Sequence, residues 1–134
     1  RFLGFVDPLE LYSLYRLCRC VVIPTKFEAA SFPLWEAFSA GAPAACSNVT
    51  SLPSQAGDGA LLFDPDDPEN MAESIKNLWL DAELRNALIE KGKARAAKLT
   101  WARTAKTFRA HYRRIAGRTL QEEDRAVIEA PVEF

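Results

Sequence analysis

Long apolar runs are absent from this sequence. No run among its 134 residues approaches the roughly 18 to 20 apolar residues that a membrane-spanning helix needs. The first residues also lack the charged, apolar and small-residue regions of a secretory signal peptide, and residues 2–6 instead favour a short strand. We therefore expect a globular, cytoplasmic protein.

Residues with reactive side chains are also scarce. His111 is the only histidine, and neither Ser39 nor Ser47 lies at a spacing from it that is typical of a hydrolase triad. The cysteines are odd in number and fit no metal or redox motif: Cys18, Cys20 and Cys46. They are interpreted as small apolar core residues of a protein in a reducing compartment.

The net charge of −1 hides an uneven distribution. Residues 85–118 contain eleven Lys or Arg and the single acid Glu90, whereas residues 121–134 contain five acids and one Arg. A basic helical stretch is suited to phosphates, acidic lipid headgroups or a partner domain, although a solvated helix face is the simpler interpretation. We predict a domain over residues 1–117, followed by an acidic tail over 118–134 whose composition favours disorder.

Short apolar stretches alternate with helical patterns along the chain. Asp7, Pro8 and Glu10 form the signature of a capping box at a helix start, and Asp67-Pro68-Glu69 starts another helix with the same Asp-Pro pair. Strands are predicted at residues 2–6, 20–24, 43–46 and 60–63. Helices are predicted from residue 8, over 32–40, and from 68 to 117 with breaks near 81 and 99–100. This order predicts an α/β fold, a Rossmann-like parallel sheet flanked by helices.

The most informative segment runs from Lys26 to Gly41. It follows a buried strand and contains two carboxylates eight residues apart, Glu28 and Glu36. Ser31 is the expected N-cap of a helix whose free amides and dipole would suit a diphosphate. Glu36, about one turn into this helix, is placed to accept hydrogen bonds from a vicinal diol such as a ribose.

This segment resembles a motif of the retaining GT-B-type glycosyltransferases of glycosyltransferase family 4. The family's donor-binding domain carries a pattern commonly written EGFGLPxLEAMACGxPV, and the present chain has EAASFPLWEAFSAGAPA. Further similarity to the family is found at residues 2–6, 47–53, 56–58, 61–65 and 101–105. The resemblance covers roughly residues 2 to 115 and implies the C-terminal half of a GT-B fold, truncated at its N-terminal side.

The resemblance implies roles for individual residues. Glu36 would bind the ribose hydroxyls of a nucleotide-sugar, and Glu28, the candidate catalytic residue, would bind the sugar that is transferred. The main chain at Val6 would meet the nucleobase. Backbone amides would line the diphosphate and the sugar: Ala30, Ser31, Phe32 and Leu34.

The implied reaction is transfer of a hexose from a nucleotide-diphosphate sugar with retention of configuration and without a metal or other cofactor. Asp64 and Asp66 form an Asp-x-Asp pattern like that of the metal-dependent GT-A enzymes, but the neighbouring prolines favour a turn that leads into a helix. Electrostatic stabilisation by amides and cations would assist departure of the diphosphate.

The sequence departs from the family pattern in two respects. Ala29 and Ser31 stand where the family usually has glycine, which lets the backbone approach a ligand closely, so the sugar end of the pocket is expected to differ. The family's cations for the diphosphate and its acceptor-binding domain both precede the part of the pattern that is matched. We therefore expect a partial donor-binding domain that is inactive without the N-terminal acceptor-binding domain of the same parent chain.

Two alternatives remain open at this stage. One is a Rossmann-like binding or regulatory module without transfer chemistry, which would show no selectivity for nucleotide-sugars. The other is a basic-helix module that docks on nucleic acid or on a membrane, with binding that weakens steeply with salt. Under the glycosyltransferase interpretation, peripheral membrane contact is allowed and no nucleic acid is expected.

Overall fold

The computed structural model describes residues 1–130 as two compact units. The first comprises Arg1–Ala97, and the second begins at Lys98. The predicted division was at residue 117; within the second unit, α6 (Trp101–Ile115) packs against α7 (Glu122–Glu129). Each unit is described by itself. The predicted acidic tail partly lies outside the described residues, at 131–134.

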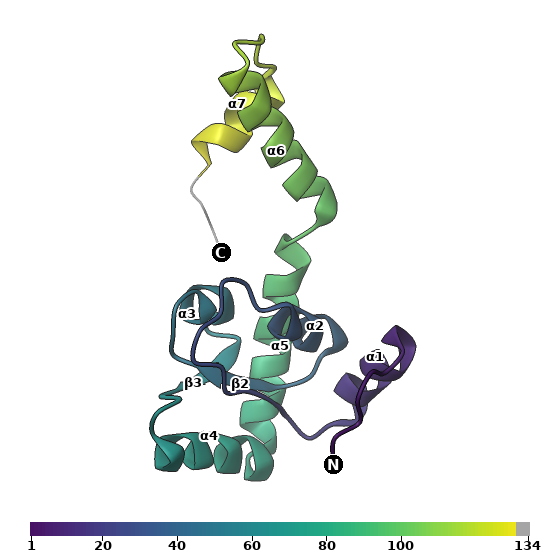
Figure 1. Ribbon diagram of the computed structural model, residues 1–134, viewed down its shortest axis with the longest axis vertical. Helices are drawn as coiled ribbons and strands as arrows, with labels where there is room; N and C mark the ends of the chain where they lie inside the picture. The colour runs from purple at the N-terminus through teal and green to yellow at the C-terminus, as the bar shows by residue number, and fades with distance from the viewer. Residues whose placement is uncertain (131–134) are drawn as a thin grey trace. The chain divides into compact units, whose positions relative to one another are not determined.

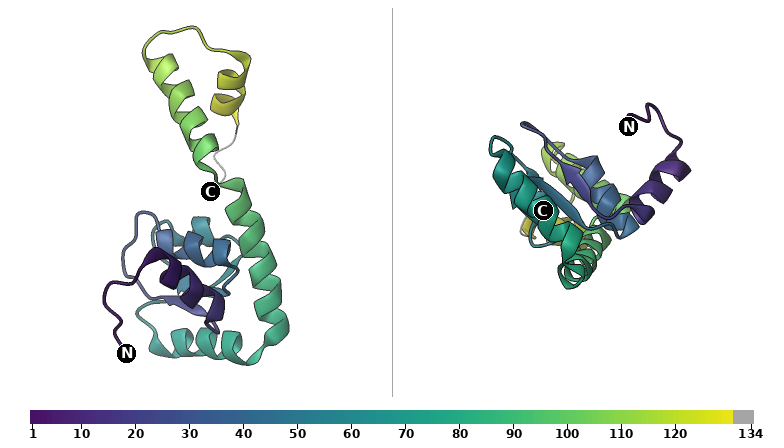
Figure 2. Two further views of the ribbon diagram at one scale, coloured as in Figure 1. Left: turned by 90° about the vertical axis from the view of Figure 1, so that its right-hand side faces the viewer. Right: turned by 90° about the horizontal axis from the view of Figure 1, so that it is seen from below.

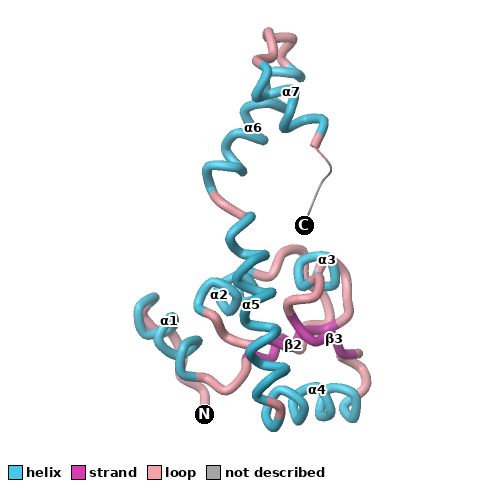
Figure 3. Tube along the Cα trace, turned by 180° about the vertical axis from the view of Figure 1, so that it is seen from behind, coloured by secondary structure: helices cyan, strands magenta, loops and turns pink. Residues whose placement is uncertain are grey.

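A parallel sheet forms the centre of the first unit. Its strands are β1 (Val21–Ile23), β2 (Ala44–Ser47) and β3 (Ala60–Phe63), hydrogen-bonded in the order β1-β2-β3. Figures 1 and 3 label β2 and β3. The pairs are in parallel register, with Ala44 opposite both Val21 and Ala60. Small residues dominate β2, which is buried along its whole length, as expected for a strand covered on both faces. The predicted α/β sheet is confirmed.

Helices cover both faces of this sheet. One face packs against α2 (Phe32–Ala40) and α3 (Leu52–Ala56), with Phe38 in the middle of the contact. The other face packs against α4 (Pro68–Leu80), and α5 (Ala82–Lys98) contributes Leu88 to that core. Figures 1 and 2 show α4 on the opposite side of the sheet from α2 and α3.

The predicted helix starts and stops are largely confirmed. Asp7 caps α1 (Pro8–Leu17) in a capping box with Glu10, and Asp67 accepts hydrogen bonds from the first turn of α4. Gly41 ends α2 in the left-handed region, at a φ of 75°, where glycine is favoured.

The predicted strand over residues 2–6 is wrong. These residues form an irregular segment in which Phe2 and Phe5 are fully exposed. A strand needs a partner for its backbone groups, and β1 pairs with β2 alone among the described residues. Apolar composition therefore misled the prediction.

Two helices were not predicted from the sequence, α3 and α7. The five-residue α3 contains a proline in its first turn, and Arg95 of α5 donates hydrogen bonds to its carbonyls at Ser54 and Gln55. These bonds satisfy carbonyl groups that a short helix leaves unpaired.

The second unit pairs α6 (Trp101–Ile115) with α7 (Glu122–Glu129). Asp124 is fully buried and accepts hydrogen bonds from Arg109 and Arg113. Glu123 forms ion pairs with Arg109 and Lys106. The expected disorder of the acidic tail is therefore wrong for α7, because the acids are neutralised by the basic helix before them.

Candidate functional site

The loop between β1 and α2 lies at the carboxyl end of the sheet, where open α/β sheets bind ligands. Ser31 is the N-cap of α2, as predicted, and Pro33 is in the first turn. Among the described residues, the backbone amides of Ala30, Phe32 and Leu34 donate no hydrogen bond. These three amides, of the four that the sequence pointed to, are the unpaired donors that an anion at a helix start would use.

Ser31 differs from its neighbours. Its backbone N–H donates a hydrogen bond of 2.9 Å to Oε1 of Gln55, so this amide is already used within the protein. The Ser31 hydroxyl is completely buried and has no hydrogen-bond partner among the described residues. Ser31 is thus an N-cap by position, although its side chain does not cap the helix.

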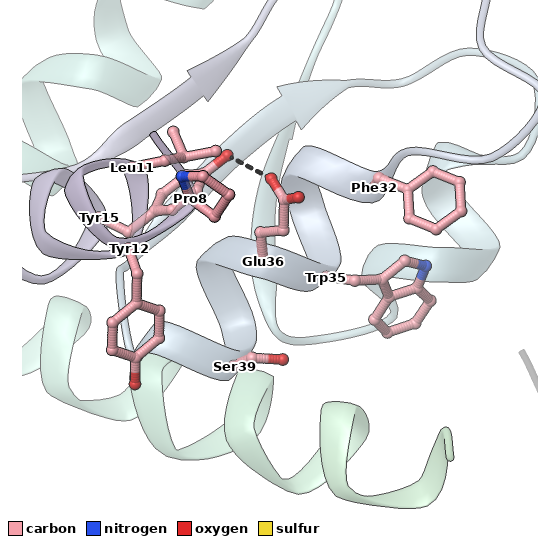
Figure 4. A pocket seen from close by; sticks show the side chains of 8 residues that line it. All are labelled: Pro8, Leu11, Tyr12, Tyr15, Phe32, Trp35, Glu36 and Ser39. Atoms are coloured by element: carbon pink, nitrogen blue, oxygen red, sulfur yellow. Dashed lines mark hydrogen bonds between the residues drawn. The ribbon is translucent and has the colours of Figure 1, made fainter. Parts of the chain in front are cut away.

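Glu36 lies on the exposed side of α2, and its Oε2 accepts a hydrogen bond of 3.0 Å from the Tyr15 hydroxyl of α1 (Figure 4). Burial, and then the hydrogen bond and charge of Glu36, raise the pKa of Tyr15 to about 12. The phenol therefore remains a donor at neutral pH, and it fixes one carboxylate oxygen of Glu36. The other oxygen makes no hydrogen bond within the described residues.

A pocket of about 270 Å³ lies between α1 and α2 beside this pair. Its walls are mainly aromatic and aliphatic, with the Glu36 carboxylate as the charged group. The lining residues are Pro8, Leu11, Tyr12, Tyr15, Phe32, Trp35, Glu36 and Ser39. A concave apolar surface with one oriented polar group is typical of a small-molecule site.

Glu28 is placed by its backbone. Its N–H donates to Thr50 Oγ1 at 3.2 Å, and its carbonyl accepts from Thr50 Oγ1 at 2.6 Å and from Ser51 Oγ at 3.0 Å. The loop after β2 therefore holds the loop after β1. The Glu28 side chain forms no hydrogen bond or ion pair among the described residues, and Glu28 does not line the pocket.

The remaining predicted residues lie partly inside and partly outside the pocket. Phe32 lines the pocket together with Glu36, whereas Val6 is half-buried just before α1 and does not line it. Asp66 forms an ion pair with Lys26, and the Asp64 carboxylate accepts a hydrogen bond from the Asp66 backbone. Within residues 1–130, no three His, Cys, Asp or Glu side chains are grouped so that they could hold a metal ion.

The basic stretch is largely satisfied inside the protein. Arg85 donates to carbonyls at the end of α4, and Lys91 pairs with Asp58. Arg109 and Arg113 bind the acids of α7, as described above. These contacts favour the interpretation that the charge asymmetry is structural. No helix within the described part of the chain is both long enough and apolar enough to span a bilayer.

Sequence reasoning missed two contributors to the site. Tyr15 and Trp35 line the pocket, and both also pack against the core of the first unit. A helical projection of residues 8–17 places Leu11 and Tyr15 on one face, which was a usable signal. No local pattern could indicate that Gln55 of α3 would bind the Ser31 amide, because the contact spans 24 residues.

Comparison with known proteins identifies the family of the chain. The profile of the family Glycosyl transferases group 1 matches residues 1–95. The O-antigen chain mannosyltransferase B of Escherichia coli is 38% identical over 101 residues, which are 75% of this chain and 26% of that protein. A D-inositol 3-phosphate glycosyltransferase of Corynebacterium jeikeium is 32% identical over 114 residues, or 84% of this chain and 27% of the relative.

A solved structure shows the same architecture. Sucrose-phosphate synthase from Thermosynechococcus elongatus superimposes with a TM-score of 0.79 at 25% sequence identity, over 87% of this chain and 30% of that one. The chain thus spans about a quarter of the length of the curated relatives named here. On this evidence the chain belongs to the glycosyl transferases group 1 family, and its first unit is a Rossmann-like domain of the GT-B type.

Proposed function

We propose that this chain is the donor-binding part of a glycosyltransferase that transfers a hexose from a nucleotide-diphosphate sugar with retention of configuration. The observation that carries the proposal is the position of Glu36. It lines a pocket close to the start of α2, where three backbone amides are unpaired. A carboxylate and an anion-binding helix start on the same short helix suit the two halves of a nucleoside diphosphate.

Glu36 would receive the ribose. Tyr15 occupies Oε2, which leaves Oε1 to accept from the hydroxyls of the sugar ring. The aromatic walls of the pocket, Phe32 and Trp35 among them, offer apolar surface beside this position.

The amides of Ala30, Phe32 and Leu34 would receive the diphosphate. The dipole of α2 adds a partial positive charge at the same place. These groups would stabilise the negative charge that develops as the sugar–phosphate bond breaks, so that no metal ion is required.

Glu28 would contact the transferred sugar. It lies at the carboxyl end of β1, three residues before the helix N-cap, and its carboxylate is not engaged by other described residues. Mannose is the sugar favoured by the names of several relatives, including the mannosyltransferases of Escherichia coli.

Transfer would require the rest of the parent protein. The relatives are about four times as long as the matched region, and an acceptor-binding domain is expected in that additional length. Lys26, the cation nearest in sequence to Glu28, is paired with Asp66. We therefore expect the isolated chain to bind a nucleotide without transferring the sugar.

Calorimetric titration with UDP, GDP, ADP and their hexose conjugates tests the proposal. We expect one nucleotide to bind best, and Glu36→Ala to weaken that binding about tenfold or more, since a hydrogen bond to a charged group contributes about 1.5–3 kcal/mol. Glu73→Ala, on the exposed side of α4, is the matched control and should bind like the wild type. Equal binding by the Glu36→Ala variant and the wild type would contradict the donor-site assignment.

A further inference from the structure

Gln55 is a buried glutamine whose side-chain oxygen and nitrogen each form a hydrogen bond beside the site. Only 5% of the residue is exposed. Its Oε1 accepts from the Ser31 N–H at 2.9 Å, and its Nε2 donates to Ser51 Oγ at 2.8 Å. A buried amide group without partners costs several kcal/mol, so a glutamine is retained in such a place only when its bonds are made.

The bonds of Gln55 continue to Glu28. Ser51 Oγ accepts from Gln55 and donates its own hydrogen to the Glu28 carbonyl at 3.0 Å. The segment 28–31 is therefore held at both ends: directly at Ser31, and through Ser51 at Glu28. This segment carries Glu28 and leads into the start of α2.

The backbone conformation of Thr50 is further evidence that the loop after β2 holds the loop after β1 in place. It is the one non-glycine residue within 1–130 that has a positive φ, 51°. A β-branched residue in that region is strained by roughly 1–3 kcal/mol and persists only where its surroundings hold it. Here Thr50 Oγ1 exchanges hydrogen bonds with both the N–H and the carbonyl of Glu28.

The backbone of Gln55 is also held by a hydrogen bond from α5. Nε of Arg95 donates to the Gln55 carbonyl at 2.9 Å, and another nitrogen of the same guanidinium donates to the Ser54 carbonyl. Gln55 is thus fixed through its backbone to α5 and through its side chain to the site.

We infer that Gln55 is a positioning residue, which sets the conformation of residues 28–31 and so aims Glu28 at the sugar. The consequence for ligand binding rests on the proposed function. Because Glu36 lies on α2 beyond this segment, Gln55 acts on the sugar end of the donor more than on the nucleoside end. It controls how much more tightly a nucleotide-sugar binds than the corresponding nucleoside diphosphate.

The first arm of the test uses no ligand. Amide hydrogen exchange is measured by NMR on the full chain for the wild type, Gln55→Leu and Ser54→Ala. Ser54 is the exposed neighbour whose side chain makes no described hydrogen bond, so it is the matched control. We expect at least tenfold faster exchange of the Ser31 amide in Gln55→Leu, with little change in the β2 amides. Exchange that rises by one common factor at all sites, or an unchanged Ser31 amide, would overturn the inference.

The second arm compares a nucleoside diphosphate with its sugar conjugate. The ratio of interest is the Kd of the nucleoside diphosphate divided by the Kd of its sugar conjugate. For the nucleotide that the wild type prefers, we expect this ratio to exceed 5 in the wild type and in Ser54→Ala. It should approach 1 in Gln55→Leu, while the Kd of the nucleoside diphosphate changes by less than about twofold. Ser51→Ala removes the link from Gln55 to Glu28 and keeps the bond from the Ser31 N–H to Gln55 Oε1. It should also lower the ratio, and it provides a second variant if Gln55→Leu does not fold.

Other results would separate the two proposals. Equal weakening of both ligands would identify Gln55 as a residue of general stability and overturn the inference. A wild-type ratio of 1 would also overturn it, because the sugar would then make no contact for Gln55 to control. If the wild type bound neither ligand, the proposed function would fail, and the exchange arm would still decide whether Gln55 positions the loop.

Discussion

The hydroxyl of Tyr15 donates a hydrogen bond of 3.0 Å to Glu36, which joins α1 to α2 beside the pocket. These two residues are 21 positions apart, and no other described side-chain hydrogen bond links the two helices. The pair orients the carboxylate before any ligand arrives. Pre-orientation of this kind reduces the cost of ordering a side chain on binding.

Replacement of Tyr15 by phenylalanine tests the value of this orientation. Tyr15→Phe keeps the ring and removes only the donor, so we expect nucleotide affinity to fall about two- to tenfold with little change in fold. Calorimetry on wild type and variant measures the effect. Tyr12→Phe in the same pocket, whose hydroxyl makes no described hydrogen bond, is the control; an equal loss in both variants would show that Glu36 does not depend on Tyr15.

The raised pKa of Tyr15 predicts a pH dependence. The unfolded phenol ionises near 10 and the folded one near 12, because burial and the Glu36 carboxylate both disfavour the phenolate. The contribution of Tyr15 to stability is therefore complete below pH 10 and is lost as the pH rises towards 12. An NMR titration of the Tyr15 Cζ resonance should give a pKa well above 10, and Glu36→Gln should lower this pKa. A Tyr15 pKa near 10 would contradict the described hydrogen bond.

Gly92 is predicted to be intolerant of even a methyl group. A Cβ at this position of α5 would lie 2.6 Å from Cδ1 of Phe38, a buried ring of α2 in the core. Overpacking of this kind costs about 1–3 kcal/mol, which opposes a gain of about 1 kcal/mol in helix propensity. We expect Gly92→Ala to destabilise the protein by up to about 2 kcal/mol in urea unfolding.

The control for Gly92 lies on the same helix. Ala94 is exposed, so Ala94→Gly reports helix propensity alone and should cost about 1 kcal/mol. If Gly92→Ala instead stabilised the protein, the described contact between Phe38 and α5 would be wrong.

Acid should separate α7 from α6. The hydrogen bond from Arg113 is the main cause that holds the pKa of Asp124 below its usual value, with further help from the Gln121 amide. A lowered folded pKa contributes stability above the unfolded value of about 3.8 and loses it as the pH falls through the folded value. Amide exchange within α7 should therefore accelerate below about pH 4.

Asp124→Asn should produce the same loosening at pH 7, since it leaves two arginines without their buried carboxylate. Glu129→Gln, at the exposed end of α7, should not. Protection of α7 that is equal in both variants would show that the ion pairs do not hold this helix.

Cysteine reactivity should follow burial. Cys46 in β2 has no exposed surface, and burial raises the pKa of its thiol to about 12, so it is neither accessible nor ionised at pH 8. Cys18 is exposed. Mass spectrometry after brief alkylation of the native protein should show a modified Cys18 and an unmodified Cys46, and modification of both at equal rates would contradict the sheet as described.

The sequence was most informative where local chemistry decides the outcome. The caps at Asp7 and Asp67 and the stop at Gly41 are each set by a few adjacent residues, and they were predicted correctly. The strand predicted at residues 2–6 is wrong because a strand depends on a partner that lies elsewhere in the chain. The disorder predicted for the tail is wrong for α7 because residues of α6 neutralise Asp124.

For the site, the sequence located the loop and the start of α2 but not their supports. Glu36 and the helix amides follow from the order of strand, loop and helix. The bonds from Tyr15 and Gln55 depend on how α1 and α3 pack against α2 and the loop, and no spacing along the chain contains that information.

The most direct test of the central claim is the ribose preference of Glu36. Wild type and Glu36→Gln are titrated with the preferred nucleoside diphosphate and with its 2′-deoxy analogue. If Glu36 accepts the hydroxyls of the ribose, the wild type should bind the ribonucleotide about tenfold more tightly or better, and Glu36→Gln should lose most of that preference. Equal binding of the two nucleotides by the wild type, or an undiminished preference in Glu36→Gln, would contradict the assignment of Glu36 as the ribose-binding residue.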